Sequence, residues 1–162
     1  MKAQNEECCP EFEPGKWDKK TFEWKNKLFI RETMRTFFHI PFPPSIGKKV
    51  TKMHELAQKA GATIPDLTDA LILFRDPSAF RSEIYYAVTK EVDGANNTTV
   101  TGSFVTSVYD GPFNKVPVFI KEMGKFLEER GQTAKDYYVH YAYCPKCAKK
   151  YNHNYMIIFA LV

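Results

Sequence analysis

One helical pattern occurs twice in this chain, at an offset of 70 residues. Residues 53–61 and residues 123–131 each open on a methionine, carry an apolar residue three positions later (Leu56 and Phe126), and close on a glycine. Two unrelated amphipathic helices that end in glycine would share part of this pattern, but the flanking segments also follow one another in the same order. The pattern therefore predicts one supersecondary unit used twice. The same offset pairs Ile46 with Val116, Val50 with Ile120 and Leu73 with Tyr143.

The first copy has the pattern of a strand, a helix and two further strands. Residues 28–40 are rich in β-branched and aromatic residues and stop at the prolines of residues 41–44, which interrupt strand and helix alike. Ser45 is a good N-cap for a helix over residues 46–60, and Gly61 supplies the left-handed residue that ends it. We expect a short strand at residues 70–74, a turn at 75–78 and a half-exposed strand at 82–91.

The second copy follows the turn-forming residues 93–97. We expect a strand at 98–109, a helix at 115–130 and strands at 136–143 and 155–161. Short, one-sided helices cover one face of an antiparallel sheet. The predicted fold is therefore α+β: two βαββ pseudo-repeats form an antiparallel sheet with helices on one face and a ligand cleft on the other. The repeats are expected at about 28–92 and 98–162 of one domain, residues 28–162, and residues 1–27 form an arm that packs on it through Trp17, Phe22 and Trp24.

The composition fits a folded domain that uses many aromatic residues. The 162 residues include 13 Phe, 9 Tyr and 2 Trp, and rings of this kind suit ligand cavities as well as cores. The net charge of +4 is too small to predict nucleic-acid binding. No apolar stretch is long enough to span a membrane, and the N-terminus lacks the apolar region of a secretory signal. We expect a cytoplasmic protein; the sequence indicates no oligomeric state.

Cys144 and Cys147 form a Cys-x-x-Cys motif between two predicted strands. Two thiolates at this spacing can bind one tetrahedral Zn²⁺, and Cys8 or Cys9 could contribute to the same site. A redox site needs the motif to open a helix within a βαβ unit, and the predicted elements do not provide that helix. Structural zinc, reduced thiols and a disulfide are all compatible with the sequence. Each would hold the arm or the hairpin in place, with no part in catalysis.

A second class of function also starts from these cysteines. Lys146, Lys149 and Lys150 surround the motif and, with it, could form a zinc-ribbon-like interaction module that contacts nucleic acid or protein. The chain has no motif that reads a nucleic-acid groove, so nucleic acid is the less expected partner.

Glu83 is the candidate catalytic residue. Strand alternation places it on the same face as Tyr85 and opposite Ile84 and Tyr86. If the apolar set faces the helices, then Glu83 and Tyr85 point into the open face of the sheet. A carboxylate beside aromatic rings can bind a cationic ligand or activate a water molecule. The alternative is a solvated glutamate paired with Arg81 or Lys90.

Further candidates for ligand binding lie near the ends of the predicted strands. His39 and Tyr109 occupy equivalent places in the two repeats, where they would flank a cleft between them. Residues 137–143 carry Tyr141 on one face and His140 on the other. An aromatic cage of Tyr85, Tyr109 and Tyr141 is the expected ligand site.

The stretch Phe104-Val105-Thr106-Ser107-Val108-Tyr109-Asp110-Gly111-Pro112-Phe113, followed by a helix that ends at Gly131, resembles the GyrI-like (SOUL-related) small-molecule-binding family. The two-repeat plan extends the resemblance to residues 28–162. The proline-bounded Phe37-Phe38-His39-Ile40-Pro41 and the Cys144–Cys147 motif resemble its stand-alone branch.

The resemblance implies a cleft that binds flat aromatic or cationic xenobiotics, with Phe113 and His140 among the binding residues, and no obligatory cofactor. Some stand-alone members hydrolyse cyclopropane-bearing, DNA-alkylating compounds, so it also implies a detoxifying hydrolase. The family usually carries a glutamate two residues before a tyrosine on the penultimate strand. Here the comparable residues are Val139 and Tyr141, and a gapless alignment places His140 at the glutamate position. The role of that acid then falls to Glu83 or to His140, or the activity is missing.

Overall fold

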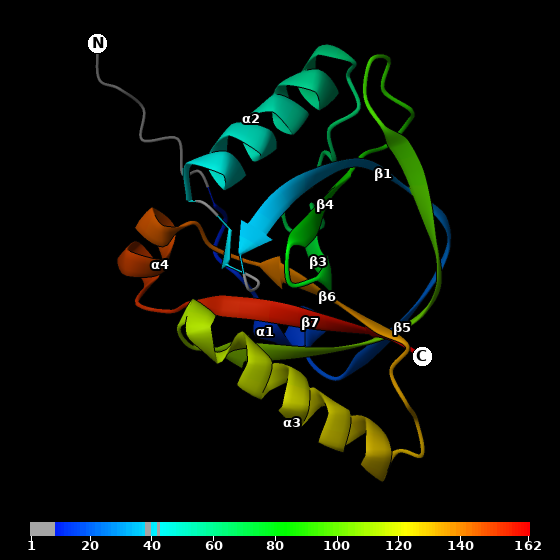
Figure 1. The fold of residues 1–162 in the computed structure, drawn as a ribbon, viewed down its shortest axis with the longest axis vertical. Helices are drawn as coiled ribbons and strands as arrows, with labels where there is room; N and C mark the ends of the chain where they lie inside the picture. Colours follow the sequence, from blue (N-terminus) through cyan, green and yellow to red (C-terminus); the bar gives the residue numbers. More distant parts are fainter. Residues whose placement is uncertain (1–8, 38–39, 42) are drawn as a thin grey trace.

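Six strands close into an antiparallel barrel in the computed structural model, which describes residues 9–37, 40–41 and 43–162 (Figure 1). The order around the barrel is β1-β4-β3-β6-β7-β5, and β5 pairs back with β1. A seventh strand within the described residues, β2, pairs only with the end of β1. Their bounds are β1 Lys20–Phe37, β2 Ile40–Pro41, β3 Ile72–Ser78, β4 Arg81–Ala87, β5 Asn97–Asp110, β6 Asp136–Tyr141 and β7 Tyr155–Leu161.

The barrel closes because β1 is long enough to pair with two neighbours. Its first part pairs with β5 and its second part with β4. The register shifts between Trp24 and Lys27, where Asn26 adopts a left-handed φ of 51°. A bulge of this kind bends a strand and increases its twist, which allows one strand to join both halves of the sheet.

The two long helices lie on opposite sides of the barrel and both cover its outer surface (Figure 1). They are α2 (Pro43–Lys59) and α3 (Val116–Glu129), and α3 is preceded by a single 3₁₀ turn, η1 (Phe113–Lys115). The element order is therefore strand, helix, strand, strand, twice over, and the predicted α+β fold class is confirmed. Among the described helices none is long and apolar enough to cross a lipid bilayer.

The repeat is visible in the side chains and caps of the two helices. Met53 and Met123 are both fully buried beneath their helices. Gly61 and Gly131 end the helices with φ values of +64° and +68°, and the residue after each donates a backbone hydrogen bond back into its own helix. The pairing of Leu73 with Tyr143 was wrong, because Leu73 lies within β3 whereas Tyr143 lies beyond the end of β6.

Several predicted element boundaries were also wrong. β1 begins at Lys20, not at Leu28, so the expected border between arm and domain falls inside a strand. Residues 75–78, expected to form a turn, continue β3. The first long helix, α2, begins at Pro43 and not at Ile46, because the first turn of a helix tolerates proline. Two short helices were not predicted: α1 (Pro14–Trp17) and α4 (Pro145–Tyr151).

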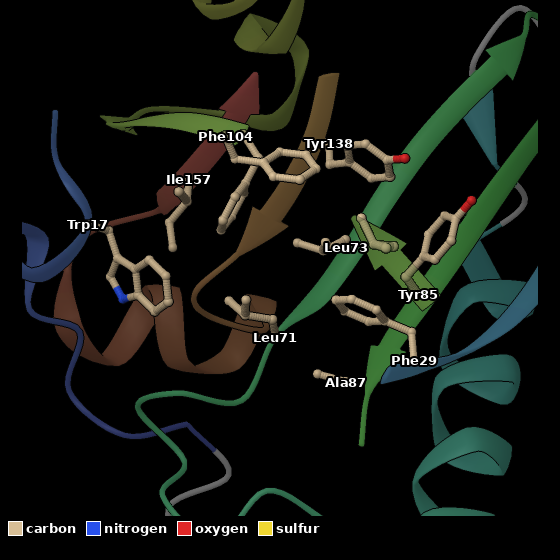
Figure 2. Close-up of a cluster of buried hydrophobic side chains, with 11 residues drawn as sticks. Trp17, Phe29, Leu71, Leu73, Tyr85, Ala87, Phe104, Tyr138 and Ile157 are labelled. Atoms are coloured by element: carbon tan, nitrogen blue, oxygen red, sulfur yellow. The ribbon is translucent and has the colours of Figure 1, made fainter. Parts of the chain in front are cut away.

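The inner face of the sheet, opposite the helices, lines the interior of the barrel and carries aromatic side chains. Trp17 packs at one side of this interior and Tyr85 at the other, with Phe29, Phe104 and Tyr138 between them (Figure 2). Residues of the N-terminal segment contribute to this packing: the Trp17 ring lies 5.2 Å from Phe22 and 6.0 Å from Phe159. The interior therefore forms a continuous aromatic cluster that ends beside Glu83.

Candidate functional site

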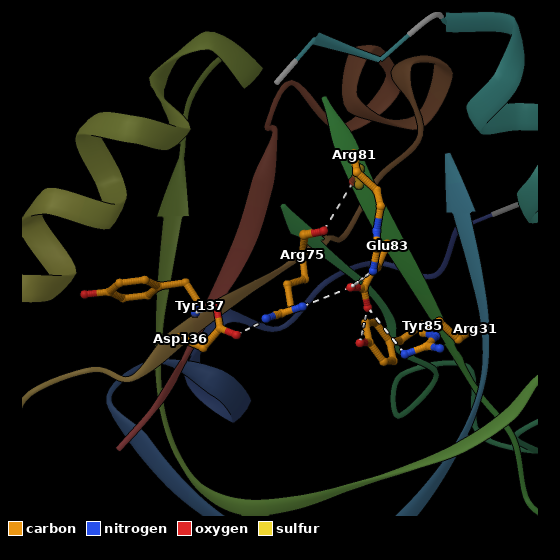
Figure 3. Close-up of polar contacts among 8 residues, drawn as sticks. Arg31, Arg75, Arg81, Glu83, Tyr85, Asp136 and Tyr137 are labelled. Atoms are coloured by element: carbon orange, nitrogen blue, oxygen red, sulfur yellow. Dashed lines mark hydrogen bonds and ion pairs between the residues drawn. The ribbon is translucent and has the colours of Figure 1, made fainter. Parts of the chain in front are cut away.

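Glu83 is an ionisable residue buried at the edge of the aromatic interior. Its position on β4 pairs it with Arg75 on β3 and Thr33 on β1, and its side chain is only 3% exposed. The phenol of Tyr85 donates a hydrogen bond to Oε2 of Glu83 at 2.5 Å. Oε1 accepts hydrogen bonds from Arg75 at 3.0 Å and from Arg81 at 3.2 Å (Figure 3). Glu83 is therefore a carboxylate with a donor on each oxygen.

A third arginine and a second carboxylate extend this network. Nη1 of Arg31 lies 3.8 Å from Oε2 of Glu83, and Nε of Arg75 donates to Oδ2 of Asp136 at 2.5 Å. Among the residues that the structure describes in this network, three guanidinium groups outnumber two carboxylates, so these five side chains carry one net positive charge. A ligand that approaches Glu83 therefore meets a positively charged rim.

The network fixes the protonation states of Glu83 and Tyr85. Burial alone would raise the pKa of Glu83, but the hydrogen bonds from Tyr85 and Arg81 and the charges of Arg75 and Arg31 outweigh it, so the pKa lies below 4.5. Burial and the hydrogen bond to Glu83 raise the pKa of Tyr85 to about 12. At neutral pH the pair is therefore a carboxylate and a protonated phenol.

Aromatic rings form the inner side of the site. The Tyr85 ring lies edge-on to Phe29 and to Tyr138, with centroids 6.0 Å and 5.5 Å away. Tyr138 in turn contacts Phe104. Residues Glu11–Lys16 line an open pocket of about 610 Å³, and Glu83 is not one of its lining residues. Glu83 and Tyr85 are 3% and 6% exposed, so a ligand reaches them only when neighbouring side chains move.

His140 lies on the inner face but does not contact Glu83 through any hydrogen bond of the described residues. Its Nδ1 is 3.1 Å from the backbone nitrogen of Ile72 and 3.2 Å from the carbonyl oxygen of Ile72. Burial lowers the pKa of His140 to about 4, against the opposing effect of the backbone contact. The imidazole is neutral at neutral pH, where it can accept the Ile72 N–H.

The expected cage of three tyrosines is not brought together. Tyr109 lies on the outer face, where its ring stacks on Phe119 of α3 at 4.9 Å and 14°. Tyr141 also lies on the outer face, with Phe113 5.2 Å away and Phe74 5.4 Å away. Tyr85 alone of the three lies beside Glu83. His39 lies outside the described residues.

The cysteine motif opens a helix, contrary to the sequence prediction of a loop. Cys144 is the N-cap residue of α4, and Cys147 lies in its first turn. The neighbouring strands β6 and β7 are antiparallel, so the βαβ context of a redox motif is absent from this part of the structure. The Sγ atoms of Cys144, Cys147 and Cys9 all lie within 4.8 Å of one another, which allows them to hold a metal ion. Cys8 lies outside the described residues.

Sequence reasoning missed most of the partners of Glu83. It named Arg81 only as the partner of a solvated glutamate, and it did not connect Arg31, Arg75, Asp136 or Tyr138 with Glu83. The alternation of β1, β3 and β6 would have placed these residues on inner faces, but the pairing of the strands was needed to bring them to Glu83.

Comparison with known proteins identifies the family. The sequence profile described as bacterial hydrolase matches residues 1–162. The chain belongs to the bacterial hydrolase family. No curated protein matches the chain with significance.

Two solved structures share the fold of this family member. The C-terminal domain of EcmrR superposes with a TM-score of 0.67 and 14% identity, covering 90% of this chain and 96% of that domain. A hydrolase from Listeria innocua superposes with a TM-score of 0.59 and 14% identity, covering 90% of this chain and 92% of that one. At this identity the likeness shows the fold alone, and the fold agrees with the GyrI-like architecture suggested by the sequence.

Proposed function

We propose that this bacterial hydrolase family member binds flat aromatic small molecules beside Glu83 and Tyr85 and hydrolyses those that carry a strained, electrophilic ring. The observation that carries the proposal is the buried carboxylate of Glu83, bonded to the Tyr85 phenol where the aromatic interior meets the charged rim. The family description and the hydrolase among the structural neighbours support the choice of reaction class.

The charge of the rim refines the class of ligand. Two like charges about 4 Å apart repel by about 4 kcal/mol at the effective dielectric constant near a protein surface. Arg31, Arg75 and Arg81 exceed the local carboxylates by one charge, so a cationic ligand is disfavoured here. Neutral, electron-poor aromatic compounds are the better fit, and the rings of Tyr85 and Tyr138 are the surfaces on which they would stack.

The residues divide the work of ring opening between them. A water molecule attacks the electrophilic ring carbon, the new C–O bond forms as the strained C–C bond breaks, and the electron pair of that bond moves to the conjugated carbonyl oxygen. Glu83 is ionised and accepts the proton of the water. Tyr85 stays protonated, and its O–H would turn from Oε2 of Glu83 to donate a hydrogen bond to the developing oxyanion, which also frees Oε2 to accept the proton. The proton on Glu83 then passes to that oxygen, so the product is the substrate plus water.

Incubation of the purified protein with cyclopropane-bearing alkylators, followed by mass spectrometry, tests the proposal. We expect a product heavier by one water, formed faster than with heat-denatured protein. Unchanged compounds that co-purify with the protein would contradict hydrolysis and leave a sequestering binder. Compounds that neither change nor bind would contradict both parts of the proposal.

A further inference from the structure

The cysteine cluster joins two segments that are far apart in the sequence. Cys9 belongs to the N-terminal segment, whereas Cys144 and Cys147 belong to the start of α4. The backbone N–H of Cys144 donates to Sγ of Cys9 at 3.4 Å, and the Tyr151 hydroxyl donates to the carbonyl oxygen of Cys9 at 3.5 Å. The three sulfurs therefore meet where the N-terminal segment docks on α4.

We propose that Cys9, Cys144 and Cys147 bind a structural Zn²⁺ that fastens the N-terminal segment, residues 9–19, over one end of the barrel. In a tetrahedral site with Zn–S bonds of about 2.3 Å the sulfurs are about 3.8 Å apart. The observed limit of 4.8 Å is close enough that a small inward shift of the side chains completes the geometry. A fourth donor completes the tetrahedral site.

The surroundings of the cluster suit a closed metal site. Cys147 is 5% exposed, and Cys9 and Cys144 are partly buried, so bulk water has limited access to the sulfurs. Three thiolates and one Zn²⁺ carry a net charge of −1. The seven-residue helix α4 carries three lysines, whose charge offsets it. Glu83 is not part of this cluster, so failure of either proposal leaves the other standing.

The segment that the metal would hold contributes to the barrel interior. The backbone N–H of Phe12 donates to the Tyr143 hydroxyl at 2.8 Å, and the Phe12 ring lies 5.3 Å from Tyr155. Further along, Trp17 enters the aromatic interior and its carbonyl oxygen accepts a hydrogen bond from Thr106. Metal binding by Cys9 therefore favours the docked position of Trp17, because both belong to one short segment.

The metal content of the protein tests this site directly. The full chain is expressed with added zinc, purified under a reducing, non-chelating condition and measured by plasma mass spectrometry, with about one Zn²⁺ per chain expected. Co²⁺ in place of Zn²⁺ should give a thiolate-to-metal charge-transfer band. Loss of an outer-sphere partner alone lowers metal affinity about 10–100-fold, so Cys144→Ser and Cys147→Ser should each lower the affinity for Zn²⁺ by more than that.

A matched control separates the metal from the docking contacts. Tyr143→Phe removes the hydrogen bond to Phe12 but keeps every sulfur, so it should retain zinc. Hydrogen–deuterium exchange should then show faster exchange in residues 9–19 after chelation of the wild type, with β5 and β7 still protected. Circular dichroism verifies that each variant is folded. A zinc-free wild type with no cobalt band, equal zinc in Cys147→Ser, or a resting disulfide in the intact mass would each overturn the proposal.

Discussion

The Tyr85 phenol donates a hydrogen bond to Oε2 of Glu83, which lies two positions earlier on the same strand. Successive residues of a strand point to opposite faces, so this spacing places both side chains on the inner face of the barrel. The bond holds the phenol in its protonated form and lowers the pKa of the carboxylic acid. This hydrogen bond therefore favours Glu83 as an ionised proton acceptor and Tyr85 as a protonated hydrogen-bond donor.

Tyr85→Phe tests the role of the phenol. It keeps the ring that packs on Phe29 and Tyr138 but removes the donor to Glu83. A hydrogen bond to a charged group contributes about 1.5–3 kcal/mol, so we expect a loss of stability of that order in denaturant titrations. Turnover should fall while the dissociation constant of a flat aromatic ligand changes little. A large loss of binding with normal turnover would contradict the assignment of Tyr85 as donor.

Glu83→Gln tests the proposed base. A positioned general base contributes about 10²–10⁴-fold to rate, so turnover should fall by such a factor while ligand remains bound. Glu32→Gln is the matched control, because Glu32 pairs with Ile84 on the neighbouring strand and its carboxylate contacts Lys49 and Lys52 on the outer surface. Single-turnover kinetics should distinguish the two variants. Equal turnover rates in the two variants would show that Glu83 is not the general base.

The partly buried imidazole of His140 should make the fold sensitive to mild acid. Its pKa is about 4 in the folded protein and 6.5 when unperturbed, so the unfolded chain binds more protons between these values. Stability therefore falls as the pH drops from 6.5 to 4, by about 3 kcal/mol from this group. His140→Asn should remove most of that slope in unfolding measured at several pH values. An unchanged slope would show that other groups cause it.

The glycines that end α2 and α3 should be costly to replace. Gly61 and Gly131 have positive φ values, and a Cβ at either would meet no atom closer than 4.0 Å, so the cost comes from the backbone alone. Alanine at either position should destabilise the protein by about 1–2 kcal/mol. Gly47→Ala within α2 is the control and should stabilise it by about 0.5–1 kcal/mol, since its surroundings are open. Thermal unfolding measures all three.

Substitution of Tyr109 tests whether this ring binds a ligand, as the sequence suggests, or only packs on α3, as the structure shows. Tyr109→Ala removes a ring stacked on Phe119 and should cost about 3 kcal/mol of stability. Binding of an aromatic ligand to the folded fraction should be unaffected, because Tyr109 lies on the outer face. Tyr109→Phe keeps the ring and should be close to wild type. Weaker ligand binding by a folded Tyr109→Phe variant would show that Tyr109 contacts the ligand.

Local patterns in the sequence determined the two βαββ units, the glycines at Gly61 and Gly131, and the shared face of Glu83 and Tyr85. These features depend on residues a few positions apart, whose relation follows from the helical and strand periods. The tertiary structure decided which residues meet. Pairing of β1, β3, β4 and β6 brought Arg31 and Arg75 to Glu83 and Asp136 to Arg75. Docking of the N-terminal segment brought Cys9 to the Cys144–Cys147 motif. Strand register and chain closure depend on packing over the whole barrel, which no local pattern encodes.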